Sequence, residues 1–170
     1  MTRVGVSLGN VCASAVYGVK NNLRETKENG YKTCPFDLMV SNYKGLIECI
    51  RDDFAYFLDL KYLICDANGI RNTYYNFGFN HETPGHANLY LKEKWPEGTN
   101  HFVNNNFRHF ITRYKERIQN FRNYLQNPRN HIIFIIQILF DPKPIGKEMF
   151  ILRDAFKKKY PTLSYEIITI

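Results

Sequence analysis

The hydrophobic and polar positions along the chain follow two patterns, short apolar runs and longer amphipathic stretches. The short runs, rich in Val, Ile, Phe and Tyr, predict strands, and they lie at residues 3–8, 35–40, 61–65, 70–77, 131–140 and 163–170. The stretches with apolar residues at helical spacing predict helices, and they lie at residues 11–24, 43–58, 104–126 and 146–159. This order favours an α/β fold with a mostly parallel sheet sandwiched by helices.

Two segments define the expected centre of that fold. HIIFIIQILF at 131–140 is apolar at nearly every position, which is typical of a strand buried on both faces. We expect it beside the strand at 3–8, in the middle of the sheet. Residues 104–126 carry an apolar stripe that includes Phe110, Tyr114 and Phe121, so we expect a long helix packed on one face of the sheet.

The middle of the chain has a different character. The turn sequence DANG at 66–69 separates two strand-like runs and predicts a hairpin. Residues 78–103 then hold repeated Gly and Pro and three of the five histidines. A long loop of this composition in a compact domain is usually functional or mobile.

Length and composition favour one domain. The chain has 170 residues and is 44% hydrophobic, which is enough for a full core. No internal repeat or linker interrupts it, so we expect residues 1–170 to form a single α/β domain. The last run ends at Ile170 without a polar tail, which fits either a terminal strand within the sheet or a shortened chain.

The charge and the ends of the chain bear on partners and location. The formal net charge is +7 and the pI is about 9.2, which favours an anionic partner without choosing among nucleic acid, phosphate, a nucleotide-sugar and an acidic membrane surface. The start of the chain has no apolar signal segment, and no apolar run approaches the roughly 20 residues of a membrane span. We therefore expect a cytoplasmic protein with reduced thiols.

Cys12 is the first candidate for chemistry. In VSLGNVCASA, residues 6–15, an apolar run stops at Gly9 and Asn10, and Cys12 follows where a helix is expected to begin. One interpretation is a small buried hydrophobe, since free Cys is often buried. The other is a nucleophile, because the positive end of a helix stabilises a thiolate. The N–H groups of Cys12 and Ala13 could then bind an oxyanion.

A thiol nucleophile needs a base, and His81 is the best placed of the histidines. It lies in GFNHE and opens the Gly/Pro-rich segment, whereas His109 is expected on a helix surface and His131 at the start of a buried strand. His81 and His86 are spaced as HExxxH with Pro84 between them, which does not form the HExxH helix of a zinc enzyme. The cysteines show no CxxC spacing, and no dinucleotide, P-loop or DxD motif occurs. We expect no metal and no cofactor.

Four stretches in order carry a resemblance to a known family. SLGNVCASA, CPFDLMVSNYKGLIECIRDDF, FNHE, and RYKERIQNFRNYLQN followed by HIIFI together resemble uncharacterised proteins described as putative papain-like cysteine peptidases. The resemblance covers about residues 1–140 and departs in having PFDL where the family has PFDW. It implies Cys12 as nucleophile, His81 as its base and Asp37 as the carboxylate that orients the imidazole, acting on a peptide, amide or ester. Asp37 could equally be a strand-end carboxylate that caps a backbone N–H.

A second interpretation belongs to a different class of protein. Arg113 and Arg117 form an i, i+4 pair on a helix with further basic residues, which is either a solvated face or a phosphate-binding face. Together with the loop at Asn10 they could bind a phosphate or nucleotide-sugar in a non-proteolytic, glycosyltransferase-like module. The expected partner is therefore a peptide or small-molecule substrate or an anionic ligand, and nucleic acid is not excluded.

Overall fold

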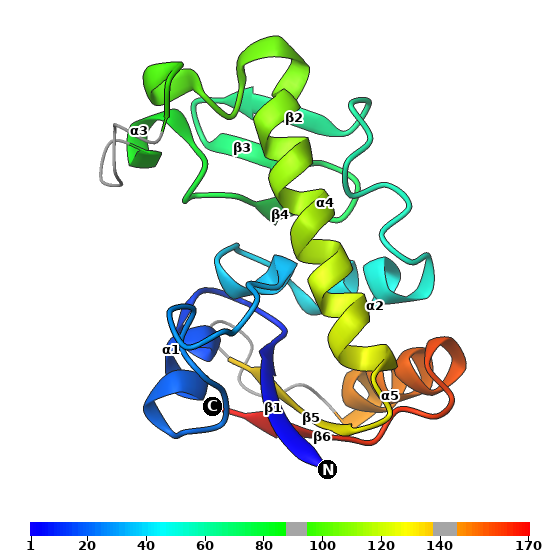
Figure 1. Ribbon diagram of the computed structural model, residues 1–170. Coiled ribbons are helices and arrows are strands. Elements are labelled where there is room, and N and C mark those ends of the chain that lie inside the picture. The colour runs from blue at the N-terminus through cyan, green and yellow to red at the C-terminus, as the bar shows by residue number, and fades with distance from the viewer. Residues whose placement is uncertain (88–94, 138–145) are drawn as a thin grey trace.

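The fold contains two sheets, one parallel and one antiparallel (Figure 1). The computed structural model describes residues 1–87, 95–137 and 146–170. The parallel sheet has the order β1-β5-β6, formed by β1 (Thr2–Ser7), β5 (Asn130–Ile136) and β6 (Tyr165–Thr169). The antiparallel sheet has the order β2-β3-β4, formed by β2 (Leu63–Asp66), β3 (Gly69–Asn72) and β4 (Phe77–Gly78). The α/β class is confirmed, but the expectation of a mostly parallel sheet fits only the first of these two sheets.

The central position of β5 explains its unbroken apolar sequence. Its Val4↔Ile132 and Val6↔Phe134 registers with β1 are parallel, and β6 pairs on its other side. Ile132, Phe134 and Ile136 face the main core, where the Phe134 ring stacks on Phe156 at 4.3 Å. Neighbouring side chains along a strand point to opposite faces, and Ile135 is fully buried on the other face. The predicted central strand is confirmed, while residues 138–140 of that prediction lie outside the described residues.

Four helices occupy predicted positions, two of them with shorter bounds: α1 (Ala13–Lys20), α2 (Tyr43–Arg51), α4 (Asn104–Gln126) and α5 (Gly146–Lys159). The one-turn helix α3 (Pro84–Ala87) was not predicted; proline is tolerated in the first turn of a helix. α2 ends early because Asp53 and Phe54 take left-handed backbone angles, with φ of 57° and 64°. In Figure 1, α4 runs from the antiparallel sheet to the parallel one. No helix within the described parts of the chain has the length and apolar character needed to cross a membrane.

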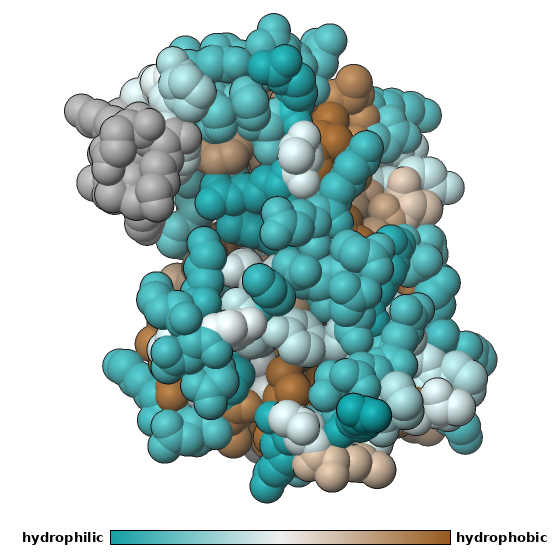
Figure 2. Space-filling model, in the orientation of Figure 1, coloured by the Kyte–Doolittle hydropathy of each residue, from teal (hydrophilic) through white to brown (hydrophobic). Residues whose placement is uncertain are grey.

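Aromatic side chains join the two sheets into one core. The centroid of the Phe36 ring lies 6.0 Å from that of Phe77 on β4 and 5.8 Å from that of Phe121 on α4. The Phe121 ring in turn lies 6.5 Å from Phe134 on β5. Aromatic pairs at such distances add to the stabilisation that burial alone provides. The face shown in Figure 2 is mainly hydrophilic, with small separate hydrophobic areas.

The predicted strand at 35–40 is wrong. Pro35–Asp37 is a single turn of 3-10 helix, η1. Proline has no N–H for a strand ladder, and the Asp37 carboxylate accepts a 2.8 Å hydrogen bond from the Cys34 N–H, which closes the turn. Only Val40 pairs as a strand would, in an isolated bridge with Gly78.

Candidate functional site

A pocket of about 300 Å³ lies where the parallel sheet meets the antiparallel one, and it contains both predicted reactive residues. It is lined by Val11, Cys12, Leu38, Met39, Val40, Asn80, His81 and His86. Three separate stretches of chain therefore meet here, and the position of each has a local cause.

Cys12 is placed by the sharp turn that follows β1. Gly9 and Asn10 both have positive φ, 86° and 54°, and Cys12 is the exposed N-cap of α1. The Asn10 side chain donates a 2.7 Å hydrogen bond to the carbonyl of Gln137, just past β5. Cys12 therefore lies at the carboxyl edge of the parallel sheet, where open α/β sheets hold their ligands.

Ser41 ties this turn to the second stretch of the pocket. Its hydroxyl accepts a 3.0 Å hydrogen bond from the Asn10 N–H and donates to the Leu8 carbonyl at 3.2 Å. The Ser41 N–H donates in turn to the Asn10 carbonyl at 3.1 Å. The turn that carries Cys12 is thereby held against residues 38–40.

His81 comes to the pocket through the bridge between Val40 and Gly78. Each of these two residues donates its N–H to the other's carbonyl, at 2.8 and 2.9 Å. His81 follows within a turn closed by the Glu82 N–H, which donates to the Phe79 carbonyl at 3.2 Å. Cys12 and His81 are far apart in the sequence. They line one pocket because backbone hydrogen bonds join the turn of Cys12 to Ser41, and join Val40 to Gly78.

Glu82 anchors the residue next to His81 to α4. Its side chain is fully buried, and its Oε1 lies 3.2 Å from Arg117 Nη1 and 3.3 Å from Arg113 Nη1. Its Oε2 accepts a 3.2 Å hydrogen bond from the Tyr114 hydroxyl. Buried charges are stable only when they are paired and hydrogen-bonded, and this cluster meets both conditions.

The surroundings of His81 favour its neutral form. Burial lowers the pKa of His81 below its usual value, and the nearby His86, Arg117 and Arg113 act in the same direction against the opposing charge of Glu82. A neutral imidazole has one unprotonated nitrogen, which is basic enough to accept a proton. The pocket is therefore lined by both an imidazole and an exposed thiol.

The other cysteines are less suited to nucleophilic chemistry. Cys34 and Cys49 are completely buried, and this burial raises the pKa of each thiol well above its usual value. Cys65 is exposed, but partial burial and then the neighbouring Asp66 raise its pKa. Since the thiolate is the nucleophile, Cys12 is the thiol whose setting best suits attack on a substrate.

Asp37 is engaged in a buried ion pair away from the pocket lining. Its Oδ1 lies 2.7 Å from Arg24 Nη1 and 3.5 Å from the Tyr31 hydroxyl, and its Oδ2 accepts from the Cys34 N–H. The pocket lining includes its neighbour Leu38. Capping of a backbone N–H, the simpler of the two interpretations, is what these contacts show, and the orientation of His81 by Asp37 stays a prediction.

The residues predicted to bind an anion are divided between two places. Ala13 is the first residue of α1, so its N–H has no acceptor within the helix, whereas the Asn10 N–H already donates to Ser41. Arg113 and Arg117 line a separate pocket of about 200 Å³ with Lys27. The alternative that joins the first turn and the basic helix in one ligand site is therefore not supported by the arrangement of these residues.

Ser41 and Glu82 are the residues whose contribution the sequence analysis missed. Ser41 resembles a helix cap, but Asn42 caps α2 by accepting the Gly45 N–H at 2.8 Å. Glu82 attracts attention only as part of the His-Glu pair. The available signal for a buried ion pair had two parts. One was a carboxylate between two aromatic, Gly-rich segments, and the other was a pair of arginines four residues apart.

The Gly9 turn offers a direct test of how Cys12 is positioned. A Cβ on Gly9 would lie 2.2 Å from the Ser41 hydroxyl oxygen, and the residue has a positive φ. We expect Gly9→Ala to lower the free energy of unfolding measured in urea. Gly30→Ala is the matched control, because Gly30 also has positive φ but a Cβ there would meet nothing within 4 Å. The extra loss in Gly9→Ala should be about 1–3 kcal/mol, and equal losses in the two variants would contradict close packing of Ser41 on the turn.

Comparison with known proteins identifies a family. The family model described as "Putative papain-like cysteine peptidase" matches residues 3–170. A search of curated proteins and a search of solved structures each gave no significant match.

Proposed function

The chain belongs to this family of putative papain-like cysteine peptidases, and from that premise we propose that it is a hydrolase with Cys12 as nucleophile and His81 as general base. The observation that carries the proposal is that an exposed thiol at the start of α1 and an imidazole favoured in its neutral form line the same pocket. The substrate class is a peptide, or another amide or ester.

The proposed reaction proceeds through a thioester. His81 takes the proton of the Cys12 thiol as the sulfur attacks the substrate carbonyl carbon. The N–H groups at the start of α1, including that of Ala13, bind the resulting oxyanion. The tetrahedral intermediate collapses, and His81 returns the proton to the departing amine or alcohol. Water, activated by His81, then attacks the thioester, which releases a carboxylic acid and restores the thiol.

Two further features of the lining support binding of a small-molecule or extended peptide substrate in this pocket. Leu38, Met39 and Val40 give one wall an apolar character, while Asn80 adds a polar amide to the lining. An apolar wall with a few polar groups is typical of pockets that bind organic ligands. We propose that Asp37 is a positioning residue, since its ion pair with Arg24 holds the 3-10 turn from which this wall extends.

Removing His81 should slow the reaction of Cys12 with iodoacetamide. In His81→Ala the thiol loses its proton acceptor, so we expect the rate at neutral pH, followed by mass spectrometry of the Cys12 peptide, to fall by about tenfold or more. In the parent protein, Cys12 should react faster than Cys65, whose pKa is raised.

His131→Ala is the control for this experiment, because His131 contacts Ser164 and does not line the pocket. We expect the alkylation rate of Cys12 in this variant to stay within about twofold of the parent rate, which is a small change, since a shift of one pKa unit corresponds to a tenfold change. Circular dichroism should show both variants folded. If His81→Ala reacts as fast as the parent protein, the Cys12–His81 pair is wrong.

A further inference from the structure

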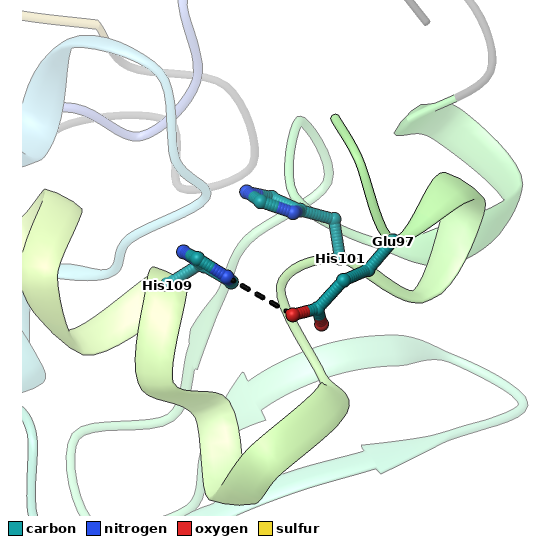
Figure 3. Close-up of side chains that lie close together, drawn as sticks. All are labelled: Glu97, His101 and His109. Carbon is teal, nitrogen blue, oxygen red and sulfur yellow. Dashed lines mark hydrogen bonds and ion pairs between the residues drawn. The ribbon is translucent and has the colours of Figure 1, made fainter. Parts of the chain in front are cut away.

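Three metal-ligating side chains meet near the start of α4, outside the Cys12 pocket. One donor atom from each of Glu97, His101 and His109 lies within 4.8 Å of the other two. Figure 3 shows the His101 and His109 rings face to face with the Glu97 carboxylate beside them, and the ring centroids are 3.9 Å apart. Glu97 and His101 flank the short helix η3 (Gly98–Asn100), and His109 lies on α4.

Two atoms of this cluster that could bind a metal ion have no hydrogen-bond partner among the described residues. His101 is only 8% exposed, and its Nδ1 and the Glu97 Oε2 are buried side-chain atoms without a partner. Leaving such atoms unpaired costs free energy, on the order of 1–3 kcal/mol for each group. A cation bound between an imidazole nitrogen and a carboxylate oxygen would satisfy both.

We propose that Glu97, His101 and His109 form a binding site for a zinc ion, with water as the fourth ligand. Two imidazoles and one carboxylate are a ligand set that Zn²⁺ uses in proteins. Imidazole nitrogen also disfavours Mg²⁺ and Ca²⁺, which prefer oxygen ligands. The sequence-based argument against a metal concerned other residues, namely His81, His86 and the cysteines.

One pair of donor atoms already has nearly the separation that tetrahedral coordination requires. Bonds of about 2.0–2.2 Å place neighbouring donors roughly 3.4 Å apart, and His109 Nε2 already lies 3.2 Å from Glu97 Oε1. The lone pair of an imidazole nitrogen lies in the plane of the ring, so the stacked His101 and His109 rings must turn about their side-chain torsions before both nitrogens face one ion.

Arg108 is the group that a bound ion would displace. Its Nη2 lies 3.3 Å from both Glu97 Oε1 and His109 Nε2. The Arg108 side chain is 62% exposed, so it can turn into solvent at little cost. The ion would then join the η3 segment to the start of α4, where Asn105, Asn106 and Phe107 depart from helical backbone angles.

Zinc chloride titrated into the full chain, with isothermal calorimetry as the readout, tests the site. We expect one equivalent to bind and to raise the melting temperature. Glu97→Gln and His109→Gln each remove one ligand at a partly exposed position, and each should weaken binding by about 100-fold or more. His131→Gln is the control, because His131 lies on β5 and contacts Ser164, just before β6, and the variant should bind zinc as the parent protein does.

Zinc could also bind the exposed thiol of Cys12, so two measurements separate the sites. Cys12→Ser should retain the tight equivalent, and cobalt chloride should give the visible bands of a tetrahedral ion without thiolate charge-transfer absorption. The proposal is overturned if the chain binds no zinc tightly, if Glu97→Gln and His109→Gln, shown folded by circular dichroism, bind as the parent does, or if binding is lost in Cys12→Ser.

Discussion

Replacing Glu82 with glutamine is expected to lower the free energy of unfolding, measured in urea, by about 3–5 kcal/mol. The Glu82 carboxylate is fully buried and is the partner of Arg117, whose side chain is only 7% exposed, and of Arg113. The Glu82→Gln substitution keeps the shape of the side chain but leaves a buried guanidinium without its counter-charge. Removing one partner of a buried ion pair destabilises a protein far more than the pair itself stabilises it.

Glu166→Gln is the matched control for this prediction. Glu166 pairs with Arg3 at 2.7 Å, but the two side chains are 45% and 65% exposed, and exposed pairs contribute about 0–1 kcal/mol. A double variant, Glu82→Leu with Arg117→Met, removes both buried charges and should be more stable than Glu82→Gln. If Glu82→Gln and Glu166→Gln lose the same stability, the buried cluster does not hold the turn of His81 to α4.

Replacing Cys12 with alanine is expected to lower kcat for the hydrolysis of p-nitrophenyl acetate by roughly four to six orders of magnitude. The reason is that the proposed thioester needs the Cys12 sulfur, and the imidazoles of His81 and His86, which also line the pocket, are weaker nucleophiles than a thiolate. Because Cys12 is an exposed N-cap without a side-chain capping bond, the variant should remain as stable as the parent in thermal unfolding.

Cys65→Ser is the control for this measurement, since Cys65 is the other exposed thiol and lies on β2. It should keep the full rate. A Cys12→Ala protein that hydrolyses the ester as fast as the parent would contradict the proposed nucleophile, and a rate lost in Cys65→Ser instead would show that the chemistry belongs to Cys65.

Local sequence patterns determined most of the secondary structure. The continuous apolar run of β5 and the stripe of α4 are strong because burial on both faces of a strand, or on one side of a helix, demands apolar residues at a fixed period. The same patterns failed at 35–40, where Pro35 and the Asp37 cap favour a 3-10 turn. They predicted the antiparallel hairpin of β2 and β3 around the turn at 66–69, but not that this hairpin belongs to a sheet separate from the parallel one, because the assignment of strands to sheets depends on pairing between distant segments.

The candidate site divides in the same way. The sequence by itself determined that Cys12 follows a strand and begins a helix, because Gly9 and Asn10 can take the positive φ that such a turn needs. It also identified His81 as a candidate base. Only the tertiary structure decided that Cys12 and His81 share a pocket, since Ser41 and the Val40–Gly78 bridge join them. Hydrogen bonds between segments that lie far apart along the chain leave no periodic signal in the sequence. For the same reason, the sequence did not predict the buried partners of Asp37 and Glu82.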